Sequence, residues 1–178
     1  AHSDDTPVTA YTYNRQGQLE TVTHGPQSVS YLYANTGQPL RETHLDGPLA
    51  GLQLDLAYDA LLRRTNLAVS SPAFALDPIA TEYTPAGQLA AVQQGRHRAA
   101  YTYDPATARL ATVLIEHAGV TRLTATRAYD PFGRLTALSY QSNPPDPSAP
   151  AYSYTHDLAD RRTSVAWRDG SVWHYAYD

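Results

Sequence analysis

Several residue types are missing from this sequence, and each absence narrows what the chain can do. The 178 residues contain no cysteine, so neither a disulfide framework nor a thiolate metal site is available. All 13 basic residues are arginine, and a net charge of −4 without a basic cluster argues against nucleic-acid binding. No run of 18 apolar residues occurs, so no membrane span is predicted.

Motifs that carry catalysis or bind metals are missing as well. The sequence has no Gly-x-Ser-x-Gly, no His-Glu-x-x-His and no cysteine nucleophile. Its seven histidines are scattered, with no partner two or four residues away. We therefore expect no enzyme activity, no metal site and no cofactor.

Both ends of the sequence look cut. It opens on a short polar stretch without a secretory signal, and it stops at Tyr177-Asp178, half-way into a repeat. We interpret the chain as a piece of a longer polypeptide. Residues 1–8 are predicted to be a flexible lead, and residues 9–178 a single domain of about seven full repeats and a truncated eighth.

A tandem repeat built on tyrosine occupies most of the chain. Its anchor position recurs at intervals of 20 to 27 residues, and it is tyrosine seven times and His156 once. A second tyrosine often stands two residues before the anchor. Of the 14 tyrosines, 12 occupy these two positions, which we take as structural: Tyr11, Tyr13, Tyr31, Tyr33, Tyr58, Tyr83, Tyr101, Tyr103, Tyr129, Tyr154, Tyr175 and Tyr177.

A turn signal follows each anchor. In Asp130-Pro131-Phe132-Gly133 the carboxylate can accept from the backbone, proline presets φ, and glycine takes the left-handed position. The aspartates recur as Asp59, Asp104, Asp130 and Asp157, and the glycines as Gly17, Gly37, Gly87 and Gly133. We interpret the carboxylates as local caps in one row of turns, because their equivalence by repeat argues against an acid/base pair. Leu62, Ala108 and Asp160 replace the glycine, and we expect those turns to differ in type.

The segments that flank the turns are typical of strands. Residues 52–58 alternate apolar and polar side chains, and no segment shows a helical period. We predict an all-β fold of tandem hairpins in one antiparallel sheet, with almost no helix. A sheet of more than about ten strands tends to curl or close, so a curled, spiralling sheet is expected, part of a hollow shell or closing as a large barrel.

The returning strands carry apolar residues three apart, which strict alternation would place on opposite faces. Either a bulge lies between the two residues or the sheet is covered on both faces, and both explanations stay open. The pairs are Leu19/Val22, Leu89/Val92, Leu110/Val113 and Leu135/Leu138.

The aromatic residues allow two interpretations. Stacked tyrosines could hold sugars, but packing against neighbouring strands is the interpretation we favour. Trp167 and Trp173 flank the Asp169-Gly170 turn. They are candidate ligand-facing residues, although a buried cross-strand pair is the favoured explanation.

The pattern Tyr-x-Tyr-Asp-x-x-Gly-Arg-Leu resembles the YD repeat of bacterial Rhs proteins, insecticidal toxin-complex shell components and teneurins. Its best copies are residues 127–135 and 101–110, and the resemblance covers residues 9–178. It implies hairpins that coil into a hollow shell around a toxic C-terminal domain, in a chain several times longer. The family's self-cleaving segment has no counterpart here.

The resemblance implies a function and a location. We expect a structural shell segment of a secreted or cell-surface bacterial toxin, delivered by a secretion system. Its partners would be the remainder of its own chain and the enclosed toxin or effector domain. The alternative is a binding module for carbohydrates or cell-surface proteins. Unpaired sheet edges further predict self-association between copies.

Overall fold

The structure is a computed structural model, and it describes residues 7–178. It divides into two units, one ending at Thr81 and the other spanning Glu82–Asp178. The predicted flexible lead lies outside the described residues except for Pro7 and Val8, which precede the first strand. Residues 7–178 contain no helix, and hence none that could cross a membrane.

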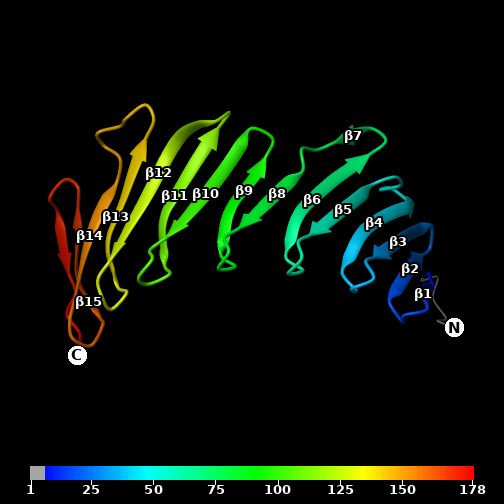
Figure 1. Ribbon diagram of the computed structural model, residues 1–178, viewed down its shortest axis with the longest axis horizontal. Coiled ribbons are helices and arrows are strands. Elements are labelled where there is room, and N and C mark those ends of the chain that lie inside the picture. The colour runs from blue at the N-terminus through cyan, green and yellow to red at the C-terminus, as the bar shows by residue number, and fades with distance from the viewer. Residues whose placement is uncertain (1–6) are drawn as a thin grey trace. The chain divides into compact units, whose positions relative to one another are not determined.

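The first unit is a meander of antiparallel hairpins in which each strand pairs with the next along the chain (Figure 1). The short strand β7 lies beside this path and pairs with β6. Strand β8 contains the boundary between the units. The strands are β1 (Thr9–Tyr13), β2 (Leu19–His24), β3 (Gln27–Tyr33), β4 (Pro39–Asp46), β5 (Gln53–Tyr58), β6 (Arg64–Ser71), β7 (Phe74–Ala75) and β8 (Ile79–Tyr83).

The second unit continues the same plan of consecutive antiparallel strands. Within residues 7–178, β1 pairs with β2 alone and β16 with β15 alone, so the sheet does not close. The predicted all-β fold of tandem hairpins is confirmed. The strands are β9 (Leu89–Gln94), β10 (His97–Tyr103), β11 (Leu110–His117), β12 (Val120–Tyr129), β13 (Leu135–Ser142), β14 (Ala151–His156), β15 (Arg162–Trp167) and β16 (Val172–His174).

A one-residue bulge interrupts the return strand of the hairpins and explains the apolar pairs three apart. Tyr13 lies opposite Leu19, whereas Thr12 lies opposite Thr21, so one residue of β2 is left out of the pairing. Val22 then lies opposite Tyr11, and opposed residues project to the same face. The bulge was one of the two explanations left open. The residues skipped in this way are Glu20, Leu40, Thr65, Ala111, Thr136 and Thr163.

Few side chains are buried, because in each unit the strands contact only their neighbours in the sheet. In the second unit Ala91 and Val165 are 0% and 5% exposed, while the apolar residues of the described part of the first unit are all half-buried or exposed. Contacts between adjacent strands therefore carry most of the stability.

Candidate functional site

The turns that follow the anchors form a series that we call the turn row. In Asn14–Gln18 the first N–H bonds the last carbonyl at 2.8 Å, and the fourth N–H bonds the first carbonyl at 2.9 Å. The same two bonds recur in five further turns that follow an anchor, and in the turn at 167–171 between β15 and β16. The turn at 104–109 has one extra residue. In each unit these turns lie at the lower ends of the strands in Figure 1. The turn row comprises residues 14–18, 34–38, 59–63, 84–88, 104–109, 130–134 and 157–161.

The fourth residue of these turns has a left-handed backbone, whether or not it is glycine. Gly17 and Gly133 have φ of 77° and 78°, and Leu62 and Asp160 have φ of 62° and 63°. The expected change of turn type at Leu62 and Asp160 was therefore wrong. The turn's own hydrogen bonds hold a conformation that costs a non-glycine residue about 1–2 kcal/mol. At Ala108, with φ of 55°, the turn does differ, by its added residue.

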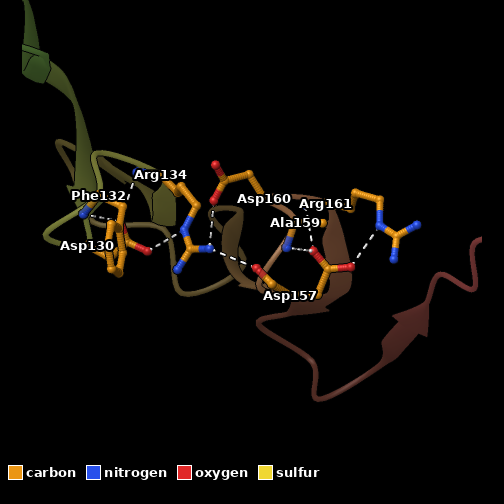
Figure 2. A network of polar contacts seen from close by, with 7 residues as sticks. All are labelled: Asp130, Phe132, Arg134, Asp157, Ala159, Asp160 and Arg161. Atoms are coloured by element: carbon orange, nitrogen blue, oxygen red, sulfur yellow. Dashed lines mark hydrogen bonds and ion pairs between the residues drawn. The ribbon is translucent and has the colours of Figure 1, made fainter.

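The aspartates cap these turns, as the sequence predicted. Asp130 Oδ1 accepts from the N–H groups of Phe132 and Arg134 at 3.0 and 2.9 Å, and Oδ2 accepts from Arg134 Nε at 2.7 Å (Figure 2). Asp59 and Asp157 make the same three bonds with their own turns. Asp104 instead caps Ala106 and Thr107, because its turn is longer.

These bonds set the pKa values of the caps. The pKa of Asp59 lies below its usual 3.8 chiefly because the Arg63 side chain bonds the carboxylate. For Asp157 the backbone N–H and then the guanidinium of Arg161 lower the pKa in the same way. Desolvation opposes the shift at Asp130, but the contacts from Arg134 outweigh it and its pKa is also lowered. The aspartates of all three turns are therefore ionised at neutral pH.

The first and last residues of the turns are matched, a signal present in the sequence that our sequence analysis missed. Every turn that starts with aspartate ends with arginine, and every other turn ends with glutamine. Asn14 Nδ2 donates to Gln18 Oε1 at 2.8 Å, a neutral counterpart of the Asp–Arg pair. Ala34 has no side-chain donor to offer, and Gln38 Oε1 is buried without a hydrogen-bond partner. The pairs are Asn14/Gln18, Ala34/Gln38, Asp59/Arg63, Thr84/Gln88, Asp104/Arg109, Asp130/Arg134 and Asp157/Arg161.

The last residue of a turn also reaches the next turn. Arg134 Nη1 donates to the carbonyl of Asp157 at 2.9 Å and to Asp160 Oδ1 at 3.0 Å (Figure 2). Gln18 and Gln88 donate to the carbonyls of Gly37 and Ala108, at 3.4 and 2.9 Å. These contacts join successive hairpins within each unit at the turn row.

Arg109 makes the corresponding contact through space that a glycine leaves open. A Cβ added to Gly133 would lie only 2.6 Å from Arg109 Nε, so the arginine packs where a side chain would stand. At Gly17, in the first hairpin, the same Cβ would meet nothing within 4 Å. Glycine at position 133 therefore leaves room for Arg109 and adopts the left-handed φ without a steric penalty.

Anchor tyrosines add a second link between hairpins. The hydroxyls of Tyr103, Tyr129 and Tyr177 donate to the carbonyls that follow the preceding turn, those of Leu89, Leu110 and Arg162, at 2.7–2.8 Å. Arg109 and Arg161 lie over the rings of Tyr129 and Tyr177, with 5.9 and 4.8 Å to the ring centroids. The anchor tyrosine thus connects its own hairpin to the one before it.

The remaining repeat tyrosines differ by their place in the sheet. Tyr31, Tyr33, Tyr58, Tyr83, Tyr101 and Tyr154 are half-buried between neighbouring strands. On the edge strand β1, Tyr11 and Tyr13 are 56% and 60% exposed. Exposure of the rings on β1 therefore accompanies the lack of a neighbouring strand on one side.

The two tryptophans do come together, but not as a buried pair. Trp167 and Trp173 lie edge to face with ring centroids 6.1 Å apart, and Tyr152 lies edge to face with Trp167 at 6.3 Å. Trp173 is 66% exposed, because β16 has no strand on its outer side. Together with Tyr154, which stacks on Tyr152, these rings form what we call the aromatic cluster.

The carboxylates of the turn row stay in separate turns, and residues 7–178 contain no group of three or more acidic or histidine side chains placed to hold a metal. One pair of histidines nevertheless meets. His97 and His117 lie opposite each other on β10 and β11, with their Nδ1 atoms 3.4 Å apart. The two histidines are 20 residues apart, and this spacing is not a metal-binding signal, so the pair is not evident from the sequence.

Comparison with solved structures identifies proteins of which a part has a similar fold. The chain is similar to part of the chains in the crystal structures of TcdB2-TccC3-TEV, of TcdB2-TccC3 and of TcdB2-TccC3 without its hypervariable C-terminal region. The TM-scores are 0.67, 0.66 and 0.63, each at 18% identity and over 90–91% of this chain. The chain spans 9% of the length of those proteins. No family model matches the sequence, and no curated protein sequence is significantly similar to it.

Proposed function

We propose that this chain is a wall segment of a YD-repeat shell that encloses a toxin or effector domain. The observation that carries the proposal is the recurrence of similar junctions between hairpins, which is most complete in the second unit. The last side chain of one turn bonds the next turn, and an anchor tyrosine bonds the hairpin before it. Such a junction adds hairpins one after another without a second layer, as repeat proteins add units. The likeness to part of the TcdB2-TccC3 chains supports the proposal.

The role proposed is mechanical and non-catalytic. A continuous ladder of backbone hydrogen bonds and capped turns makes a wall that a cargo domain cannot cross while the wall is folded. Its partners are the remainder of a longer chain and the enclosed domain. It acts outside the producing cell, as a secreted or surface protein delivered by a secretion system.

Protection from protease tests this function. The native polypeptide that contains these repeats is isolated, its intact mass is measured, and it is digested with trypsin before and after unfolding in urea. We expect a much longer chain in which a part outside the repeats resists trypsin until the repeats unfold. A native protein of 178 residues, or a long one whose other domains are cut at once, would refute enclosure.

A carbohydrate-binding module is the second candidate, and the aromatic cluster is the observation that favours it. Exposed Trp173 next to Trp167 and Tyr152 offers ring faces of the kind that stack on sugars. A glycan array with the wild type and Trp173→Ala separates the two functions. A glycan signal lost in the variant supports the module, and no signal on the array rejects it.

A further inference from the structure

We propose that His97 and His117 form a chelating site for a divalent transition metal of the zinc type. The two residues are a cross-strand pair at the ends of β10 and β11, on the side of the strands opposite the turn row. Their rings are 4.6 Å apart between centroids and inclined by 47°, and the two Nδ1 atoms approach to 3.4 Å. Both side chains are solvent-accessible enough for an ion to reach them.

The separation of the two nitrogens fits tetrahedral coordination. Zn²⁺ binds histidine nitrogen at about 2.0–2.1 Å, so two ligands of one tetrahedron stand about 3.3–3.4 Å apart. The Nδ1 atoms already have this separation of 3.4 Å. Two ligands of a square-planar ion would be closer, at about 2.9 Å. The pair therefore fits a tetrahedral ion such as Zn²⁺, once the hydrogen bond between the two Nδ1 atoms is broken and each ring turns its lone pair toward the metal.

The strands hold the histidines in place before any metal arrives. β10 and β11 are paired over their whole length, from His97↔His117 to Tyr103↔Leu110. Beside His97 lies a hollow of about 290 Å³ lined by Val92, Ala99 and Ile115 among others, which gives the His97 ring room to rotate. On the other side His97 faces Gln94 of β9, whose side chain reaches the same face of the sheet. Water completes the coordination sphere.

The other histidines of the strand ends provide a contrast. His24 closes β2 and its Nδ1 bonds the Thr9 hydroxyl at 2.8 Å, across a strand pair of the same kind. His44 lies 3.2 Å from Glu42 on its own strand. Among residues 7–178 neither faces a second histidine, so each offers a metal a single imidazole. His24 is thus a matched control for His97 and His117.

Titration with Zn²⁺ alone tests the site. Histidine ring signals are followed by NMR, and binding is measured by calorimetry, for the wild type and for His97→Gln, His117→Gln and His24→Gln. We expect one Zn²⁺ per chain, with the signals of His97 and His117 moving together. Because the second ligand binds intramolecularly, either single variant should weaken binding by at least roughly a hundredfold, while His24→Gln leaves it unchanged.

The outcomes that overturn the proposal are separate from a failure to fold. His24 and His97 are exposed and His117 is half-buried, and a native backbone amide spectrum confirms that each variant is folded. No binding at millimolar Zn²⁺ in the folded wild type refutes the site. So does binding that survives His97→Gln or His117→Gln, or binding that His24→Gln weakens equally. Protection of a cargo domain from trypsin is independent of every one of these results.

Discussion

The two ends of the strands differ in regularity. At one end the turn row repeats a single five-residue turn, with one exception of six residues. At the other end the connections between hairpins, which we call the connection row, range from two residues to eight. Gly95-Arg96 and Ala118-Gly119 are tight turns, whereas residues 143–150 form a long loop. The connection row comprises residues 25–26, 47–52, 72–78, 95–96, 118–119, 143–150 and 168–171.

The hydrogen bonds between neighbouring hairpins are likewise more regular in the turn row than in the connection row. In the turn row the contact between neighbouring hairpins is made by the same turn position each time, from Gln18, Gln88 or Arg134. In the connection row the contacts are individual, such as the Ala118 N–H to the Arg96 carbonyl and Arg168 to the Ala149 carbonyl. The turn row therefore defines the repeat, and the connection row accommodates variation.

The largest expected effect comes from adding a methyl group to the turn row. Gly133→Ala should destabilise the protein by about 1–2 kcal/mol through its left-handed backbone. It should cost about 1 kcal/mol more because it displaces Arg109 from Tyr129. Gly17→Ala and Gly119→Ala, with φ of 77° and 76° and no neighbour within 4 Å, should show the backbone cost alone. Urea denaturation measures all three, and equal losses would contradict the packing role of Gly133.

Removing an anchor hydroxyl should have a smaller effect. Tyr103→Phe deletes the bond to the Leu89 carbonyl, which should cost about 1 kcal/mol. Tyr58→Phe is the matched control, because its hydroxyl makes no corresponding bond to the return strand before it among the described residues. Thermal and urea unfolding of the two variants should differ by that amount. If Tyr103→Phe were no more destabilising than Tyr58→Phe, the bond to the Leu89 carbonyl would contribute nothing measurable, and packing of the ring would explain the anchor.

Acid should destabilise the turns that begin with aspartate more than the turns without a carboxylate. The lowered pKa values of Asp59, Asp130 and Asp157 mean that their stabilisation is complete well above pH 3.8 and is lost as the pH falls through the folded-state values. The double variant Asp130→Asn/Arg134→Gln copies the Asn14/Gln18 turn. We expect it to stay near wild type at pH 7 and to lose less stability between pH 5 and pH 2. The urea midpoint across this range is the measurement, and parallel pH profiles would refute the assignment.

The smallest effect is expected from lengthening the connection row. Four Gly/Ser residues inserted between Pro145 and Asp146 should lower the free energy of unfolding by no more than about 0.6 kcal/mol, the loop-closure cost of doubling the length of a flexible loop. The same insert between Pro131 and Phe132 should be more damaging, since it separates Asp130 from the N–H groups it caps. Circular dichroism melts of the two insertions compare the rows directly. Equal tolerance at both sites would remove the distinction.

The sequence predicted best those features that depend on residues close together in the chain. Tyrosine spacing and the Asp-Pro-x-Gly signal predicted the hairpins, the turn positions and the capping carboxylates, because a turn depends on four or five consecutive residues. It did not decide between a bulge and a sheet covered on both faces, since that depends on pairing with another strand. Leu62 and Asp160 misled us, because hydrogen bonds elsewhere in the turn hold a backbone that their own side chains disfavour.

Contacts across strands were harder to find. The matching of aspartate with arginine and of other residues with glutamine was visible in the sequence, and comparison of the repeats with one another would have shown it. The meeting of His97 and His117 was not visible, because it depends on the register of β10 against β11. The exposure of Trp173 likewise depends on which strands pair with β16.

The bulges that follow the turn in six of the hairpins restore the alternation of side chains between the two faces of the sheet. Side chains alternate between the two faces of a strand, so one residue gained or lost would exchange the faces for all that follows in that strand. Skipping Glu20 or Thr136 brings the residues after the turn back into phase with the tyrosines. At 104–109 the turn itself absorbs an extra residue, and Tyr103 still faces Leu110. Each bulged hairpin thus sets its own strand register, as the hairpin with the six-residue turn at 104–109 illustrates.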